Sequence, residues 1–287
     1  MALGSSPPAE VWRQSLQGFG FCPKGEMFWI LQGGAMLTNI RAFVGSGMFF
    51  LLLVVGILFF TLWIVSVWPF SSLLYRREVA RSWADYNRRV LSWTCGLVEN
   101  QQGLEHLPPP PYLLFVKHQS AWETVTLHAL FPVFVLVLKK SLLHIPVFGW
   151  ALRATGQIAI DRSLGVQSMH MMHDRGLEEF RRGVSVVVFP EGTRVAPGEV
   201  GKYNAGGIAL AIEAGVPIVP VAHNAGSFWR RRAFLKKAGV IQVRIGPSIA
   251  TLGCDKKDRK RLLEEAKNSV ESMMAAIYAE RPDLRDG

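Results

Sequence analysis

A histidine and a carboxylate stand five residues apart in the stretch "KHQSAWET", residues 117–124, as His118 and Glu123. Neutral imidazole accepts a proton near neutral pH, and a neighbouring carboxylate can orient the ring and stabilise the imidazolium that forms. Five residues on a regular helix correspond to about 500° of rotation, which leaves the two side chains about 140° apart. The two groups therefore meet only if His118 lies in the turn before a helix that contains Glu123.

The same stretch also has a purely structural explanation. Ser120-Ala-Trp-Glu123 matches the S-x-x-E capping box, in which Ser120 is the N-cap and the glutamate accepts a backbone N–H. Taken alone, the stretch favours a capped helix start over a catalytic pair, because capping boxes are common.

A second stretch, "PEGTR" at residues 190–194, follows the apolar run "VSVVVF". Gly192 allows close backbone approach, Thr193 offers a hydroxyl, and Arg194 supplies a planar fork that suits phosphate. An ordinary Pro-Glu-Gly turn is the alternative. Both stretches follow apolar, β-prone runs, and ligand sites in α/β sheets lie beyond the carboxyl ends of strands. Together they indicate one site.

The elements that would position this site alternate along the chain after four prolines at 108–111. β-prone runs alternate with helical segments, and a long helix is predicted from about residue 255 to 280. The runs are "YLLFVK", "VFVLVL", "QIAID", "VSVVVF", "PIVPVA" and "VIQVRIG". This pattern predicts an α/β domain with a mostly parallel sheet flanked by helices.

Residues 42–75 contain no Asp, Glu, Lys or Arg. As one helix they would be about 51 Å long at ~1.5 Å per residue, against a hydrocarbon core of ~30 Å. A buried helix of a soluble core is usually much shorter, and a cleaved signal peptide would start nearer the N-terminus. The segment is predicted to be a helical membrane anchor. The arginines that follow it predict a cytoplasmic side at its C-terminal end, and they are Arg76, Arg77, Arg81, Arg88 and Arg89.

Residues 76–107 then predict an amphipathic helix and linker. Its apolar positions are Val79, Trp83, Tyr86, Val90 and Trp93, which recur at steps of four and three. Such a helix could lie on anionic lipid, or it could pack its apolar face on the core. The chain is thus divided into an N-terminal segment (1–41), an anchor (42–75), this helix (76–107) and the main domain (108–287).

The net charge of +10 and the three cysteines set outer limits. The cysteines have no metal or disulfide spacing, and His170 and His173 lack supporting ligands, so no metal site is expected. The basic clusters at 230–232 and 256–261 lack interleaved aromatics, which argues against nucleic acid and favours a solvated face, anionic lipid or an acidic carrier protein. His223 is expected to be a structural loop residue.

Four stretches occur in the order and approximate spacing of the motifs of glycerolipid acyltransferases. They are His118-x4-Glu123, "GQIAIDR" (156–162), "FPEGTR" (189–194) and "VPIVPVA" (216–222). The chain resembles bacterial 1-acyl-sn-glycerol-3-phosphate acyltransferases. The resemblance implies acyl transfer from a thioester to the sn-2 hydroxyl of 1-acyl-sn-glycerol-3-phosphate, which gives phosphatidate. It implies no cofactor, an acyl-CoA or acyl-carrier-protein thioester as co-substrate, and a bacterial inner membrane location with the catalytic domain on the cytoplasmic side.

Carried over by position, the resemblance makes His118 the general base and Glu123 its partner. It assigns Pro217 and its neighbours to a pocket for the acyl chain or donor. It assigns the glycerol phosphate to Lys139, Arg162, Glu191, Gly192, Thr193 and Arg194. Three positions depart from the usual pattern, namely Glu123 in place of Asp, Ser141 in place of a carboxylate, and Ala205 in place of a basic residue.

The reaction needs no enzyme nucleophile, which fits the absence of a G-x-S-x-G elbow. Backbone N–H groups at the helix start after His118 are expected to stabilise the oxyanion. The alternatives are a related glycerophosphate or lysophospholipid acyltransferase with another acceptor, and a non-catalytic lipid-binding membrane protein.

Overall fold

The computed structural model describes residues 35–285, without the side chains of residues 35–38, 162 and 166. Most of the predicted N-terminal segment (1–41) therefore lies outside the described residues. The chain divides into two units, Met1–Ile40 and Arg41–Gly287, and the site lies in the second.

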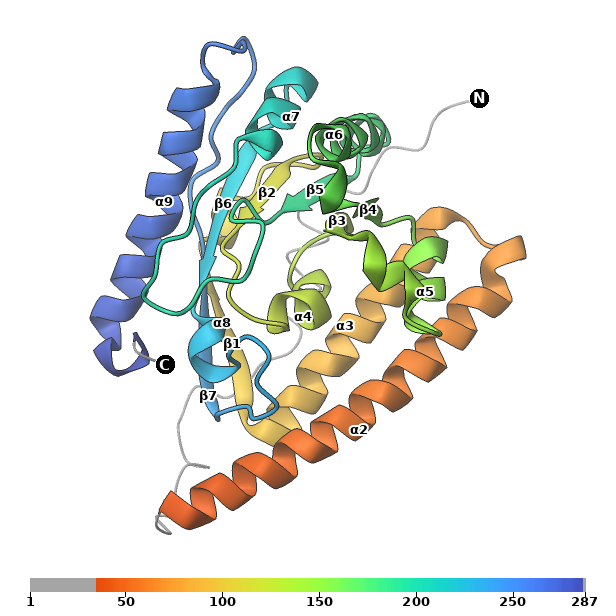
Figure 1. Cartoon of the computed structure of the whole chain (residues 1–287), viewed down its shortest axis with the longest axis vertical. Coiled ribbons are helices and arrows are strands. Elements are labelled where there is room, and N and C mark those ends of the chain that lie inside the picture. The colour runs from red at the N-terminus through yellow and green to blue at the C-terminus, as the bar shows by residue number, and fades with distance from the viewer. Residues whose placement is uncertain (1–34, 286–287) are drawn as a thin grey trace. The chain divides into compact units, whose positions relative to one another are not determined.

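Within the described residues, seven strands form one sheet in the order β1-β7-β6-β2-β5-β3-β4 (Figure 1). Only β6 and β7 are antiparallel; the other neighbours run parallel. The mostly parallel sheet predicted from the sequence is therefore confirmed. The strands are β1 (Leu97–Gln102), β2 (Leu113–Val116), β3 (Phe134–Lys139), β4 (Ile158–Ile160), β5 (Ser185–Val188), β6 (Ile218–His223) and β7 (Gly239–Ile245).

Helices cover both faces of the sheet. The side chains of each strand point alternately to the two faces, so a separate apolar core lies on each side. Leu114 and Val116 of β2 join the core under α3, α4 and α8, whereas Leu113 and Phe115 join the core under α6, α7 and α9. The helices are α2 (Ala35–Val67), α3 (Leu73–Cys95), α4 (Trp122–Leu130), α5 (Phe148–Ala154), α6 (Val166–Arg181), α7 (Gly206–Ala214), α8 (Ala225–Phe228) and α9 (Arg259–Glu280), with short 3-10 turns between several of them.

The charge-free run at 42–75 was expected to form one helix. It instead comprises most of α2, a turn and the first three residues of α3, so it belongs to a helical hairpin. The helix α2 ends at Val67, a 3-10 turn covers Trp68–Phe70, and Ser72 caps α3 by accepting the Tyr75 N–H at 3.2 Å. The chain then doubles back along α2 (Figure 1). The segment Asn39–Phe70 is long and apolar enough to cross a membrane, so α2 stays the candidate anchor.

Two glycines let α2 and α3 approach each other closely. A Cβ on Gly45 would lie 2.2 Å from the Thr94 carbonyl oxygen, and one on Gly56 would lie 2.5 Å from the Tyr86 ring. The Tyr86 hydroxyl also donates a hydrogen bond to the Leu52 carbonyl at 2.8 Å. The hairpin is therefore packed, and α2 is not a detached tether.

The helix α3 belongs to the domain, since Val79, Trp83 and Val90 on its apolar face are buried. Its first two arginines, Arg76 and Arg77, are buried as well. Arg76 donates to the Ala154 carbonyl at 2.7 Å, and Arg77 forms a 2.8 Å ion pair with Glu179 of α6. These two residues fix α3 to its neighbours. Because α3 runs back along α2 and Tyr86 contacts Leu52 and Gly56, Arg88 and Arg89 lie beside α2 and not beyond its C-terminal end.

The strand β1 lies before the prolines and was not predicted. It pairs in parallel with β7, starting with Leu97 opposite Gly239. The sheet therefore begins on the N-terminal side of the boundary expected near residue 108.

Candidate active site

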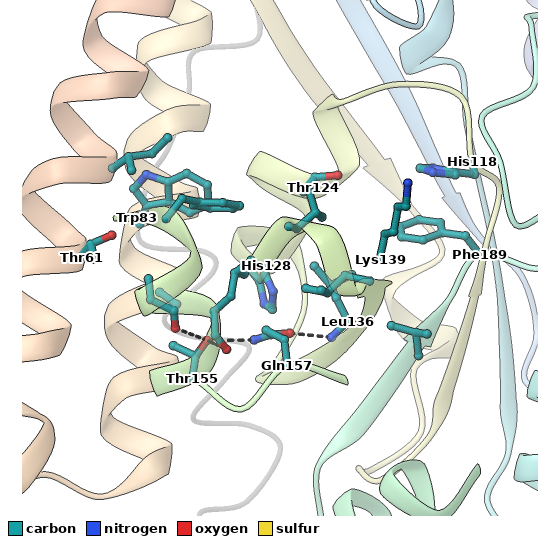
Figure 2. Close-up of a pocket in the computed structure, with 18 of the residues that line it drawn as sticks. Thr61, Trp83, His118, Thr124, His128, Leu136, Lys139, Thr155, Gln157 and Phe189 are labelled. Carbon is teal, nitrogen blue, oxygen red and sulfur yellow. Dashed lines mark hydrogen bonds between the residues drawn. The ribbon is translucent and has the colours of Figure 1, made fainter. Parts of the chain in front are cut away.

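Four strand ends meet at one edge of the sheet, because β2, β3, β5 and β6 run in the same direction. His118 follows β2, Lys139 ends β3, "FPEGTR" follows β5, and His223 ends β6. A pocket of about 380 Å³ opens at this edge, and residues from the first three of these strand ends line it (Figure 2).

His118 lies in the turn before α4, as predicted, and the "FPEGTR" loop fixes its position. Its ring stacks on Phe189 with the centroids 4.2 Å apart. Its backbone N–H donates to Glu191 Oε2 at 2.9 Å, and its carbonyl accepts the Val195 N–H at 2.9 Å. The two loops are therefore one structural unit.

Glu123 lies in the first turn of α4 and is fully buried. Its carboxylate accepts the backbone N–H groups of Gln119 at 2.7 Å and Ser120 at 2.9 Å. The N-cap is Ala121, one residue later than predicted, although the Ser120 hydroxyl still accepts the Trp122 N–H at 3.1 Å. Glu123 thus closes the helix start in the way the capping interpretation expected.

The same carboxylate also faces the histidine. Glu123 Oε1 lies 3.7 Å from His118 Nδ1, somewhat beyond hydrogen-bonding distance. Burial raises the pKa of Glu123, but interactions with His223 and His118 outweigh burial and bring this pKa below its ordinary range. The capping contacts of Glu123 and its approach to His118 therefore coexist, with an ionised carboxylate.

The N–H groups of Gln119 and Ser120 are consequently occupied by Glu123. The expectation that backbone N–H groups at this helix start stabilise an oxyanion is not supported for these two groups. Their hydrogen bonds instead hold the carboxylate in place.

His223 is a further residue of this cluster, and its side chain is fully buried. His223 Nε2 lies 3.2 Å from Glu123 Oε1 and 2.8 Å from the Lys117 carbonyl oxygen, and His223 Nδ1 accepts the Ala225 N–H at 3.3 Å. Two acceptors require a proton on Nε2, and a donor requires none on Nδ1, so the ring is the neutral Nε2–H tautomer. From the sequence, His223 was expected to be a structural loop residue, whereas it is the last residue of β6 and contacts Glu123.

Glu191 lies in a buried ion pair. Its Oε1 is 2.8 Å from Lys117 Nζ, which is also 2.8 Å from Glu271 Oε1 on α9. Glu191 is not among the residues that line the pocket, whereas the resemblance assigned it to the glycerol phosphate. The structure instead places it where it orients the His118 loop.

Positive side chains gather at the end of the pocket near His118. Lys139 extends toward His118 and Phe189 in Figure 2. Gly192 occupies the left-handed region at φ +66°, which suits the tight turn before Thr193 and Arg194. Among the described residues, Arg194 Nε is buried without a hydrogen-bond partner. Two more arginines, Arg231 and Arg232, also line this end of the pocket. The lining residues that could contact a phosphate here are Lys139, Gly192, Thr193, Arg194, Arg231 and Arg232.

The other end of the pocket is apolar and reaches α2. Its wall there consists of Ile57, Phe60, Ile64, Trp83 and Phe148, from α2, α3 and α5. His128 also lines this part, where burial lowers its pKa to about 3 and the charges of Arg77 and Arg81 act in the same direction. Its ring is therefore neutral, and this end offers an uncharged chamber.

Comparison with known proteins agrees with this geometry. Residues 99–224 match the family model described as "Acyltransferase". The 1-acyl-sn-glycerol-3-phosphate acyltransferase of Pseudomonas aeruginosa is 39% identical over 201 residues, which cover 70% of this chain and 78% of that protein. The chain belongs to the 1-acyl-sn-glycerol-3-phosphate acyltransferase family.

More distant members extend the similarity. The human 1-acyl-sn-glycerol-3-phosphate acyltransferase alpha is 28% identical over 190 residues, or 65% of this chain and 67% of that protein. The crystal structure of the 1-acyl-sn-glycerophosphate (LPA) acyltransferase PlsC from Thermotoga maritima aligns with a TM-score of 0.68 at 20% identity, covering 83% of this chain and 98% of that one. The latter likeness supports the fold.

Of the residues that the resemblance assigned to the acyltransferase site, Pro217 lies apart from it and Arg162 has no described side chain. Pro217 precedes β6, and its carbonyl accepts the N–H of Leu113, the first residue of β2, at 2.9 Å. It therefore lies at the opposite edge of the sheet, about 17 Å from the site at ~3.3 Å per strand residue. Arg162 begins a 3-10 turn after β4, but its side chain lies outside the described residues.

Arg231 and Arg232 are pocket residues of this acyltransferase that sequence reasoning did not assign. They follow α8, well beyond the four motifs, and nothing in their spacing points to the pocket. The fold brings them there because the segment after α8 passes over the same sheet edge as His118.

Proposed function

We propose that the enzyme transfers an acyl group from an acyl thioester to the sn-2 hydroxyl of 1-acyl-sn-glycerol-3-phosphate and releases phosphatidate and a free thiol. The observation that carries this proposal is the position of His118, with Glu123 buried behind it, in a pocket with a cationic and an apolar end. The cationic end suits a phosphate, and the apolar end suits an acyl chain. The names of the relatives support the same acceptor.

In the proposed reaction His118 Nε2 takes the proton of the acceptor hydroxyl as its oxygen attacks the thioester carbonyl carbon. The tetrahedral intermediate then collapses, the carbon–sulfur bond breaks, and the thiolate takes the proton from the imidazolium. Glu123 stabilises the imidazolium and holds the proton-bearing Nδ1 toward itself. The 3.7 Å separation shortens as the ring becomes charged.

Purified protein tests the acceptor and the donor together. We expect 1-acyl-sn-glycerol-3-phosphate to be the preferred acceptor over glycerol 3-phosphate and over lysophospholipids with larger headgroups. A higher kcat/KM with one of those acceptors would replace the proposed one. The same assay, run once with acyl-CoA and once with acylated acyl carrier protein, identifies the donor. We propose that the enzyme lies at a bacterial inner membrane, held by the candidate anchor α2, with the catalytic domain on the cytoplasmic side.

Arg194 is predicted to hold the acceptor phosphate, because its buried Nε has no hydrogen-bond partner among the described residues and its side chain lines the pocket. Arg194→Lys replaces two aligned donors with one point charge, and we expect KM for the acceptor to rise about 10-fold with little change in kcat. Steady-state kinetics check this result. Arg175→Lys on the exposed surface of α6 is the matched control. An unchanged KM would remove Arg194 from the phosphate site.

His223 is predicted to be a positioning residue for Glu123. His223→Phe removes the Nε2–H donor, and we expect kcat to fall about 10- to 100-fold with KM nearly unchanged, since hydrogen bonds to charged groups contribute ~1.5–3 kcal/mol. His223→Gln can place an amide N–H near the same position and should recover most of the loss. A lower melting temperature with normal kcat in His223→Phe would show that the residue only supports the fold.

A further inference from the structure

The segment after α8, residues 230–237, rests on the N-terminal half of α2. The Lys236 backbone N–H donates to Ser46 Oγ of α2 at 2.9 Å. The Lys236 ammonium lies 4.9 Å from the Phe49 ring, 4.7 Å from the Trp229 ring and 5.2 Å from the Phe234 ring. A cation among three aromatic rings is held by cation–π attraction, so this segment is fastened to α2.

The outer side of the same segment is apolar at its tip. The Phe234 ring contacts the rings of Phe43 and Phe50 on α2, with centroids 5.6 and 6.5 Å apart. All three rings remain exposed, and Leu235 beside them is 45% exposed. The apolar surface of the candidate membrane helix therefore continues onto residues 234 and 235.

Positive charge flanks this tip. Arg230, Arg231, Arg232 and Lys237 are exposed, and two of these arginines also line the pocket that contains His118. An apolar tip with basic flanks is the pattern of segments that insert into the interface of an anionic membrane. We propose that residues 230–237 form a second membrane contact, in which Phe234 and Leu235 enter the acyl region of an anionic leaflet and the arginines lie at its phosphates.

A lipid leaflet fits this surface better than a second copy of the chain. A two-fold interface would place the same residues on both sides, so the arginines of one copy would face those of the other. A leaflet offers anionic headgroups to the arginines and hydrocarbon to the rings, and α2 already presents its exposed apolar side chains there. This inference rests on the proposed anchoring by α2. It implies that the mouth of the pocket lies at the level of the lipid phosphates.

Site-specific labelling of the full chain tests the contact without reference to acyl transfer. Cys22 and Cys254 are replaced by serine, while Cys95 stays because it is buried and burial raises its thiol pKa. Leu235→Cys is labelled with bimane and reconstituted into vesicles of phosphatidylcholine and phosphatidylglycerol. Leu252→Cys, an 86% exposed apolar position between β7 and α9, is the matched control. A melting temperature equal to that of the unlabelled protein confirms the fold of each labelled variant.

We expect nitroxide lipids to quench the label at residue 235 several-fold more than the label at 252, and aqueous iodide to show the reverse order. Equal access of iodide to both labels would overturn the proposal. Protection of residue 235 from both quenchers would indicate that it is covered by protein, here a second copy of the chain, and would also overturn the proposal.

The anionic preference has its own test. Vesicles without phosphatidylglycerol should give weaker nitroxide quenching at residue 235, and equal quenching would refute this preference. Because the readout is fluorescence, a failed acyl-transfer assay with this acceptor would leave the result interpretable.

Discussion

His118→Ala is expected to lower kcat for acyl transfer by ~10³- to 10⁴-fold, because His118 is the one imidazole among the described residues that line this end of the pocket. KM for the acceptor should change little, since the phosphate contacts proposed above are made by other residues. The loss is measured as the rate of phosphatidate formation under saturating substrates.

The His118 side chain is 14% exposed and stacks on one ring, so its removal should cost about 1 kcal/mol of stability or less. A melting temperature near that of the unmodified protein would therefore accompany the loss of activity. His173→Ala on α6 removes a histidine that also lies near a glutamate, Glu213, and should leave kcat unchanged. If His118→Ala retains more than about a tenth of the wild-type kcat, the general-base role is wrong.

Glu123→Gln is expected to lower kcat by up to ~10⁴-fold, because an uncharged amide neither stabilises the imidazolium nor fixes the tautomer of His118. The structure adds a cost in stability that the capping box alone does not predict. Both carboxylate oxygens accept the Ser120 N–H, at 2.9 and 3.1 Å, and an amide nitrogen cannot replace the second of these acceptors. We expect a loss of about 1–2 kcal/mol of unfolding free energy, measured by thermal or denaturant melts.

The double variant separates catalysis from stability. If His118 and Glu123 act as a unit, His118→Ala combined with Glu123→Gln should be scarcely slower than the worse single variant. A Glu123→Gln protein that is destabilised but turns over at the wild-type rate would reduce Glu123 to a helix-capping residue. If the kcat losses of the two single variants multiply in the double variant, His118 and Glu123 contribute to catalysis independently.

The fold was largely predictable because its strands are short β-branched runs buried on both faces, and such runs differ clearly from the helical segments between them. The strand β1 escaped prediction because it lies at the sheet edge and reads "LVENQQ", a mostly polar run whose side chains are only alternately buried. The position of His118 before α4 followed from local spacing alone, since turn and helix are adjacent in sequence.

The contacts that sequence reasoning missed join residues far apart in the chain. His223 meets Glu123 a hundred positions away, Arg77 meets Glu179, and Lys117 meets both Glu191 and Glu271. Local periodicity carries no information about such pairings. The sequence alone therefore could not show that Glu191 contacts the His118 loop and Lys117 and does not line the pocket.

The helix α2 forms part of the pocket wall, through Ile57, Phe60, Thr61 and Ile64. A fragment that begins at α3 would lose the candidate membrane anchor and also one wall of the pocket, so that side of the apolar chamber would be open to water. Chain-length preference or inhibitor affinity measured on such a fragment would describe a different cavity. Screening therefore needs the full chain in detergent or nanodiscs, and substitutions at the four α2 positions offer a direct way to alter which acyl chains the enzyme accepts.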